Sequence, residues 1–229
     1  IFTALFSNLT SADDLIVNTN TTWVSGQYTY DNVTITNGAT LTFGGAVTLN
    51  TTNLTIYTSS SISADGTGYG AGSGHGAGGG GYYAGGGGYG GKGGDGLSAR
   101  DYGGFGGVTY GSAIAPVDSG SGGGSAHGGS GGSGGGAIRL IVTDTLTLNG
   151  KITANGSNGG SNSGGGSGGS IYITTKVLSG SGYITANGGN RIDPKTRNLK
   201  KHLKNYKLKT ETRAKTKAKK LQKKHMAKQ

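Results

Sequence analysis

The 229-residue chain contains no cysteine, two prolines, one methionine and one tryptophan. Without cysteine, the sequence excludes disulfides, thiolate zinc sites and a cysteine nucleophile. No stretch of the sequence is apolar for as long as a membrane-spanning helix requires, so none is expected. The chain begins with Ile1 instead of Met, which we interpret as a mature or trimmed chain from which a targeting segment has been removed.

Apolar residues are also scarce, because they supply only 31% of the chain, whereas glycine supplies 52 residues. Glycine normally makes up roughly 7% of a protein. A chain of this composition cannot bury a broad apolar core along its whole length. Part of it must therefore be ordered by hydrogen bonds or by neighbouring segments, or stay mobile.

Charge is distributed very unevenly along the chain. Residues 191–229 hold 16 of the 21 Lys and Arg residues but two of the ten acidic residues, so this tail carries +14 and the rest −3. The composition therefore predicts three parts: an apolar N-terminal segment over 1–11, a glycine-rich β region over 12–190, and a Lys-rich tail over 191–229.

Short strands are predicted over 12–66, 137–149 and 171–177, where apolar residues alternate with Thr, Asn and Ser. Alternation with a period of two, rich in Val, Ile and Thr, is typical of strands with one buried face. β-Branched residues are frequent and no helical period appears, which argues against helices.

An internal repeat is the most informative pattern. The sequence Ile-[Ser/Thr]-Ala-[Asp/Asn]-Gly occurs at 62–66, 152–156 and 184–188, each time after an alternating strand. Ile152 and Ile184 are 32 residues apart, and Ile138 and Ile171 are 33 apart. The Asx-Gly pair tolerates a positive φ and predicts a turn. Repeated strand units at a fixed period indicate a solenoid.

We therefore expect an all-β fold, a right-handed parallel β-helix (solenoid) with glycine-rich insertions at 66–136 and 156–170. Of residues 66–136, 35 of 71 are glycine. Such tracts can pack as polyglycine-II-like extended helices hydrogen-bonded sideways, and a mobile glycine coil is the alternative. The Lys-rich tail is expected to be disordered or helical.

The glycine-rich run from Asn155 to Ile173 resembles the β-helical segments of large bacterial surface proteins and adhesins, and 23–45 resembles their opening turns. The glycine tracts also resemble the adhesin tips of phage tail fibres. The resemblance covers 12–190 in style and implies an architecture more than an activity. The basic tail departs from both patterns.

The tail predicts binding to polyanions such as anionic cell-surface polymers, glycans, acidic lipid surfaces or nucleic acid. Nucleic acid is disfavoured because Tyr206 is the tail's only aromatic residue. A solvated cationic tail is the alternative. The lysines considered for polyanion binding are Lys200, Lys201, Lys204, Lys219, Lys220, Lys223 and Lys224.

Catalytic chemistry is not expected, and we predict that the protein is not an enzyme. A β-helical enzyme that cleaves polysaccharides would need two carboxyl groups about 5–10 Å apart in one cleft. Asp13 and Asp14 are adjacent and would point to opposite faces of a strand, and Asp65 falls in the turn of the repeat. No pair of histidines has metal-ligand spacing. No cofactor is predicted beyond a weak calcium candidate at Asp95, inside a single copy of a calcium-type nonapeptide.

Other candidate residues concern binding, assembly and modification. Tyr82, Tyr83 and Tyr89 in the glycine tract are the predicted ligand-binding residues, with packing over glycine backbone as the alternative. Phe2, Leu5 and Phe6 are predicted to pair with a neighbouring subunit. Sequons for N-glycosylation occur at Asn8, Asn20, Asn32, Asn50, Asn53 and Asn155.

Together these features favour a secreted or cell-surface structural or adhesive protein that assembles with itself into a filament or fibre. The first alternative is an adhesin module that binds a carbohydrate or a receptor through tyrosines of the glycine tracts. The second is a polysaccharide-degrading enzyme.

Overall fold

The computed structural model describes residues 13–96 and 103–192. The predicted assembly residues Phe2, Leu5 and Phe6, the sequon at Asn8 and the tail lysines lie outside these ranges. The chain divides into two units, Ile1–Arg191 and Ile192–Gln229, and every described strand lies in the first.

Every regular element in the described residues is a β-strand. The strands are β1 (Leu15–Val17), β2 (Thr21–Trp23), β3 (Gly26–Ile35), β4 (Thr40–Phe43), β5 (Val47–Ile56), β6 (Ser61–Ser63), β7 (Ala137–Val142), β8 (Thr145–Leu148), β9 (Lys151–Thr153), β10 (Ser170–Thr174), β11 (Val177–Ser179) and β12 (Tyr183–Thr185). Because this part of the chain contains no helix, it also contains none that could cross a membrane.

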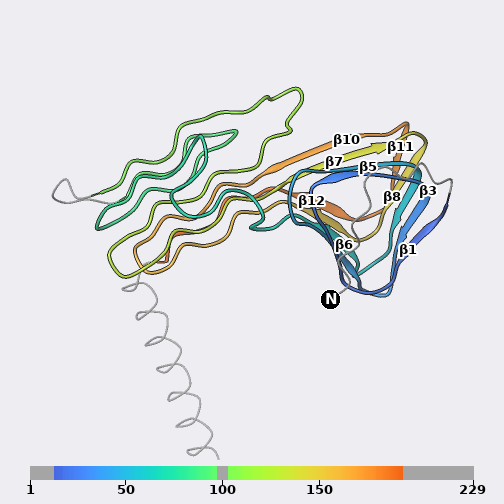
Figure 1. Ribbon diagram of the computed structural model, residues 1–229, viewed down its shortest axis with the longest axis horizontal. Helices are drawn as coiled ribbons and strands as arrows, with labels where there is room; N and C mark the ends of the chain where they lie inside the picture. Colours follow the sequence, from blue (N-terminus) through green and yellow to red (C-terminus); the bar gives the residue numbers. More distant parts are fainter. Residues whose placement is uncertain (1–12, 97–102, 193–229) are drawn as a thin grey trace, which may run out of the picture. The chain divides into compact units, whose positions relative to one another are not determined.

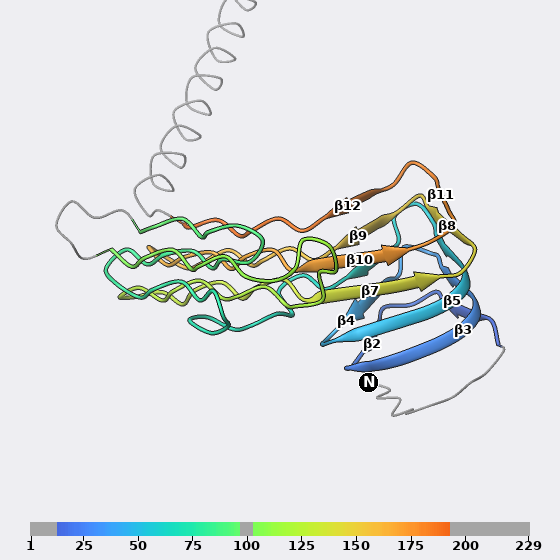
Figure 2. The ribbon, with the colours of Figure 1, turned by 90° about the horizontal axis from the view of Figure 1, so that it is seen from above.

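The strands form two sheets in which all pairings are parallel. One sheet has the order β1-β3-β5-β7-β10, with β8 and β11 continuing the row beside the second half of β5. The other has the order β2-β4-β6-β9-β12. Figures 1 and 2 show the strands stacked from the blue N-terminal end to the orange C-terminal end.

Register follows the apolar pattern, since a shift of one residue would turn every apolar side chain to solvent. Leu15, Val33, Leu54, Leu146 and Leu178 pair in one line across the first sheet. We call such a line of residues, paired in register across neighbouring strands, a column. In the second sheet, Thr21, Leu41, Ile62, Ile152 and Ile184 form the equivalent column.

The apolar core lies between the inward faces of the two sheets. Its largest fully buried side chains are Phe43, Ile35, Leu41, Leu49, Leu54, Ile56, Ile62, Ile138, Leu140, Leu146, Ile152 and Val33. Trp23 closes the N-terminal end by stacking on Tyr28, with ring centroids 4.1 Å apart, and on Phe43 at 5.8 Å. Burial of aliphatic and aromatic surface is therefore what holds this half of the unit together.

The structure corrects the predicted fold class. We expected a right-handed parallel β-helix, but the described residues form two sheets of parallel strands, with no helix and no closed barrel. The prediction was wrong because the Ile-x-Ala pattern fixes only which side chains face the core and which strands can pair in register. Between β6 and β7 the chain leaves the sheets for the whole of residues 64–136.

The glycine-rich residues form a bundle of extended segments beside the sheets, defined here as the glycine bundle: 66–96, 103–136, 154–169 and 186–190. Figures 1 and 2 both show these segments running side by side away from the strands. Their main-chain N–H groups donate to carbonyl groups of neighbouring segments at 2.7–3.0 Å. The glycine tract is thus ordered by hydrogen bonds between segments.

Hydrogen bonds in the glycine bundle point in directions that repeat every three residues. Gly85 and Gly88 donate to one neighbour, at Gly79 and Gly76, and Ala84 and Gly87 donate to another, at Asn162 and Gly165. Gly86 lies between them and donates to Gly94 on a third. An extended helix with three residues per turn aims successive N–H groups in three directions. One segment can therefore bond to several neighbours at once, which a flat strand cannot.

Glycine is required in the bundle mainly because the segments approach so closely. A Cβ on Gly164 would strike the carbonyl oxygen of Gly85, and one on Gly104 would strike that of Gly79. Neither residue has a positive φ, so the constraint is space and not backbone conformation. Neighbouring segments could not keep these hydrogen bonds if side chains separated them.

Candidate functional site

Three features of the described residues could carry a function: aromatic side chains on the glycine bundle, polar ladders along the sheets, and an uncovered edge at the C-terminal end of both sheets. Each is built by a different part of the sequence.

The predicted ligand-binding tyrosines do not form one site. Tyr82 is 58% exposed and packs edge-on against Tyr83, with ring centroids 5.0 Å apart. The guanidinium of Arg191 lies 5.7 Å from the Tyr83 ring centre, within the range of a cation–π contact. Tyr82 is therefore accessible from solvent, and the half-buried Tyr83 lies next to a cation.

Tyr89, in contrast, is a packing residue and is only 9% exposed. Its ring covers Gly111, where φ is +84° and a Cβ would meet the ring. Burial is the main reason that the pKa of Tyr89 is raised. Ser170 and the main chain of Asp118 lie close to its hydroxyl, but no hydrogen bond of good geometry forms. The alternative of packing over glycine backbone thus describes Tyr89.

Sequence analysis missed an aromatic row formed by Tyr69, His75, Tyr110 and Tyr89. His75 lies edge-on to Tyr69 at 6.0 Å and 5.4 Å from Tyr110, whose ring meets Tyr89 at 5.0 Å. Tyr69 is 39% exposed and His75 is exposed. These residues are scattered over 69–110, and no spacing in the sequence could have brought them together.

Buried serines anchor the aromatic row to the glycine bundle. The Ser121 hydroxyl is fully buried, donates to the Tyr110 oxygen at 2.8 Å and accepts from the Gly76 N–H at 2.9 Å. Tyr110 in turn donates to the Ser119 carbonyl at 2.5 Å. Burial is the main reason that the pKa of Tyr110 is raised.

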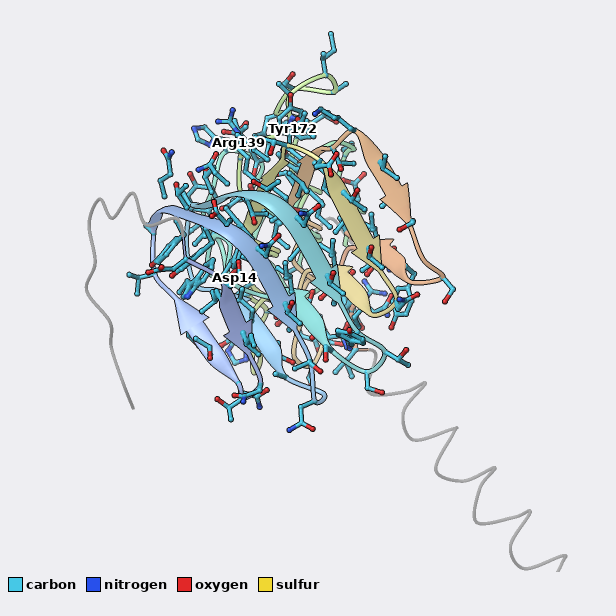
Figure 3. The ribbon with its side chains drawn as sticks, turned by 90° about the vertical axis from the view of Figure 1, so that its right-hand side faces the viewer. Asp14, Arg139 and Tyr172 are labelled. Carbon is cyan, nitrogen blue, oxygen red and sulfur yellow. The ribbon has the colours of Figure 1, made fainter. Side chains whose placement is uncertain are left out.

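Several of the predicted glycosylation residues take part in ladders of hydrogen-bonded polar side chains. The Asn53 amide nitrogen donates to the Asn32 side-chain oxygen at 2.9 Å, and that of Asn32 donates to Asp14 at 2.7 Å. Asp14 lies at the N-terminal edge in Figure 3. Since a glycan is attached through the amide nitrogen, modification of Asn32 or Asn53 would compete with this ladder.

The remaining described sequons differ in their surroundings. Asn20 is exposed and accepts from the Thr40 N–H at 2.9 Å. The amide nitrogen of Asn50 is buried and has no hydrogen-bond partner among the described residues. Asn155 accepts from the Asn187 N–H at 2.8 Å, and its own N–H donates to Asp65 at 2.6 Å. The Asp or Asn at the fourth position of the repeat thus joins neighbouring chain segments.

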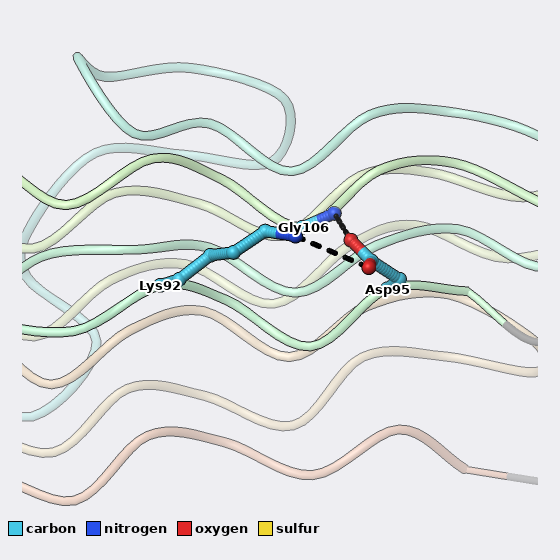
Figure 4. A network of polar contacts seen from close by, with 3 residues as sticks. All are labelled: Lys92, Asp95 and Gly106. Atoms are coloured by element: carbon cyan, nitrogen blue, oxygen red, sulfur yellow. Dashed lines mark hydrogen bonds and ion pairs between the residues drawn. The ribbon is translucent and has the colours of Figure 1, made fainter.

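Asp95, the calcium candidate, is already bonded within the protein. Its carboxylate accepts from the Gly106 N–H at 2.6 Å and from the Lys92 ammonium at 3.1 Å, as Figure 4 shows. The Gly106 hydrogen bond and then the Lys92 contact lower the pKa of Asp95. Among residues 13–96 and 103–192, no group of three or more His, Cys, Asp or Glu could hold a metal ion.

The C-terminal edge consists of β10, β11 and β12, and no described strand pairs with its outer side. Leu178 is 60% exposed and Ile184 is 42% exposed, whereas their column neighbours Leu146 and Ile152 are 0% exposed. Val177 and Tyr183 are also exposed, at 49% and 57%. Apolar residues that fill the core in each inner strand are uncovered here.

A shallow hollow of about 310 Å³ lies at the corner of this edge. Its lining consists of Thr58, Ser59, Ser60, Asn149, Gly150, Lys151, Ser181, Gly182 and Tyr183. On the outer face of the first sheet, Arg139 of β7 lies 5.7 Å from the ring centre of Tyr172 of β10, and both are labelled in Figure 3.

Comparison of the chain with protein-family models, with curated proteins and with solved structures gave no match. The functional argument therefore rests on the geometry of the chain itself.

Proposed function

We propose that this chain is a secreted or cell-surface structural or adhesive protein, without enzymatic activity, that assembles with itself into a filament or fibre. The observation that carries the proposal is the uncovered C-terminal edge. Leu178 and Ile184 occupy core columns and yet are 60% and 42% exposed. An edge of parallel strands with exposed apolar residues is a template for pairing with another chain.

Two further features suit a structural role. The glycine bundle is held by main-chain hydrogen bonds that link each segment to several neighbours. The tail carries a net charge of +14, whereas residues 1–190 carry −3. A positive charge of this size favours attraction to anionic polymers of a cell surface. The resemblance to glycine-rich segments of bacterial surface proteins supports the same proposal.

Negative-stain electron microscopy with light scattering on the same samples, over a range of protein concentrations, tests the proposal. We expect end-to-end particles or filaments whose length and scattering mass grow with concentration. A monodisperse monomer at every concentration, in buffers of low and physiological salt, would refute self-assembly.

A second candidate function is binding of a carbohydrate or a receptor by exposed tyrosines on the glycine bundle. It is favoured by the exposed Tyr82, which packs against the half-buried Tyr83 beside Arg191. Flat, amphipathic rings bind sugars with little loss of side-chain entropy. Tyr82→Ala should weaken glycan binding in an array or by calorimetry while leaving the melting temperature unchanged. Unaltered binding by this variant would exclude Tyr82 from a binding surface.

A further inference from the structure

In both sheets, the residues at the C-terminal end of a column are complementary to the residues at its N-terminal end. Figure 3 shows the blue N-terminal edge and the orange C-terminal edge on opposite sides of the strands. β1 and β2 stand at the N-terminal ends of the two sheets, and β10, β11 and β12 at the C-terminal ends. All pairings are parallel, so both edges present strands that run in the same direction.

Side-chain size is complementary between the two edges. Trp23 of β2 pairs with Phe43, and the residues that follow β6, β9 and β12 in the equivalent position are Ala64, Ala154 and Ala186. If a second β2 were added beyond β12, the large Trp23 would lie against the small Ala186. In the first sheet, Leu15 would continue the column that ends in the 60% exposed Leu178.

Charge is complementary in the same register. Val177 and Leu178 would lie beside Asp14 and Leu15, which places the Lys176 ammonium next to the Asp13–Asp14 pair. Lys176 and Asp14 are both exposed. The contact between opposite charges would favour this register over one displaced by two residues, and the effect would weaken at high salt.

We infer that the C-terminal edge of one copy binds the N-terminal edge of a second copy by parallel strand addition, with β11 against β1 and β12 against β2. This inference rests on the proposed self-assembly and names its interface. Repetition of the same head-to-tail contact gives an open chain of subunits, because the contact joins two different surfaces.

The sequence of the tail lacks the residue pattern of a further pair of strands. Residues 193–229 contain no Val and no Ile, and Lys and Arg supply 15 of them. Strands that continue the two apolar columns would need alternating apolar residues. A second copy supplies these residues at the required positions, whereas the tail does not.

Engineered disulfides in the full-length chain test the inference, because the chain has no native cysteine. The test variant is Ile16→Cys with Ser179→Cys. Both positions are exposed, and they stand at the two ends of the same outward-facing column. Within one chain they are four strand spacings, about 19 Å, apart, too far for a disulfide. Across the proposed contact they become direct neighbours. The matched control is Thr22→Cys with Ser179→Cys, because Thr22 is also exposed at the same edge but belongs to the other sheet.

Under mild oxidation with a glutathione couple, the test variant should give a ladder of covalent dimers and larger species on a non-reducing gel. Its yield should be at least tenfold that of the control and should fall on dilution. Equal yields in the two variants, or crosslinks confined to single chains, would overturn the proposed contact. If the protein still formed filaments in the microscope, self-assembly would stand and only the interface would be wrong. If neither filaments nor crosslinks formed, both would fail.

Discussion

The two halves of the described unit use different forces to order the chain. In the sheets, side chains such as Leu54 and Ile152 are 0% exposed and fill the space between the strands. In the glycine bundle, the absence of side chains lets main chains touch, and hydrogen bonds in three directions join the segments. A chain with only 31% apolar residues can thus be ordered throughout its described part without a single continuous apolar core.

The stability of the sheets and the stability of the glycine bundle should therefore respond in opposite ways to a change in side-chain size. The sheets lose stability when a methyl group is removed, because a cavity forms. The bundle loses stability when a methyl group is added, because the main chains must separate.

The largest effect is expected from Leu146→Ala in the sheet core. Leu146 is 0% exposed, so the substitution should lower the free energy of unfolding by about 2–5 kcal/mol. The matched control, Leu178→Ala, lies in the same column but is 60% exposed and should cost less than about 1 kcal/mol in dilute solution. Urea unfolding of both variants measures the difference. Equal losses would show that the C-terminal edge is covered within the monomer.

Adding one methyl group at Gly164 should have the next largest effect. The new Cβ would strike the Gly85 carbonyl, so Gly164→Ala should destabilise the protein by about 1–3 kcal/mol. Gly91→Ala is the control, because nothing lies within 4 Å of its added Cβ and its φ is not positive. Thermal unfolding should separate the two. A Gly164→Ala variant as stable as Gly91→Ala would contradict the close packing of the bundle.

Removal of the Ser121 hydroxyl should have a smaller effect that is confined to the bundle. Ser121→Ala leaves the buried Gly76 N–H without its acceptor, which should cost about 1–2 kcal/mol. Amide hydrogen exchange should show faster exchange at Gly76 and unchanged exchange in β7 and β8. Ser125→Ala is the control, because the Ser125 hydroxyl also accepts a main-chain N–H, that of Gly131, but at an exposed position where water can replace it. Slow exchange retained at Gly76 would exclude this role for Ser121.

The smallest effect is a pH dependence at Asp95. Its pKa is lowered in the folded state, so the contribution of its contacts is present above the ordinary Asp pKa of about 3.9 and disappears as the pH falls through the lower, folded value. Asp95→Asn should therefore melt slightly below the wild type at pH 6, and the gap should close on acidification towards pH 2. A gap that stayed constant with pH would assign the effect to something other than this carboxylate.

Particular residues show how far sequence reasoning could reach. Alternation at 47–49 and 54–56 predicted strands with a buried face, and Val47, Leu49, Leu54 and Ile56 are all buried. The shared repeat placed Ile62, Ile152 and Ile184 in one position, and these three residues do occupy one column. The predicted β-helix, however, was wrong, because local alternation does not state how the strands are grouped into sheets.

The candidate sites were harder to predict than the strands. Tyr82, Tyr83 and Tyr89 look alike in the sequence, but Tyr82 is exposed whereas Tyr89 is buried against Gly111. Their difference depends on which glycine segment lies next to each ring, and a tract of glycine has no side-chain pattern to specify its neighbours. The aromatic row was missed for the same reason.

By itself, the sequence determined the strands within 12–66, 137–149 and 171–177, the inward side of these strands, the repeat that keeps the columns in register, and the separation of charge between the tail and the rest. These are properties of neighbouring residues, set by alternation and by composition. Only the tertiary structure decided the grouping into two sheets, the partners of each glycine segment, and the exposure of Leu178 and Ile184. Exposure depends on whether another strand follows in space, and a residue at the last position of a column has the same local sequence as one in the middle.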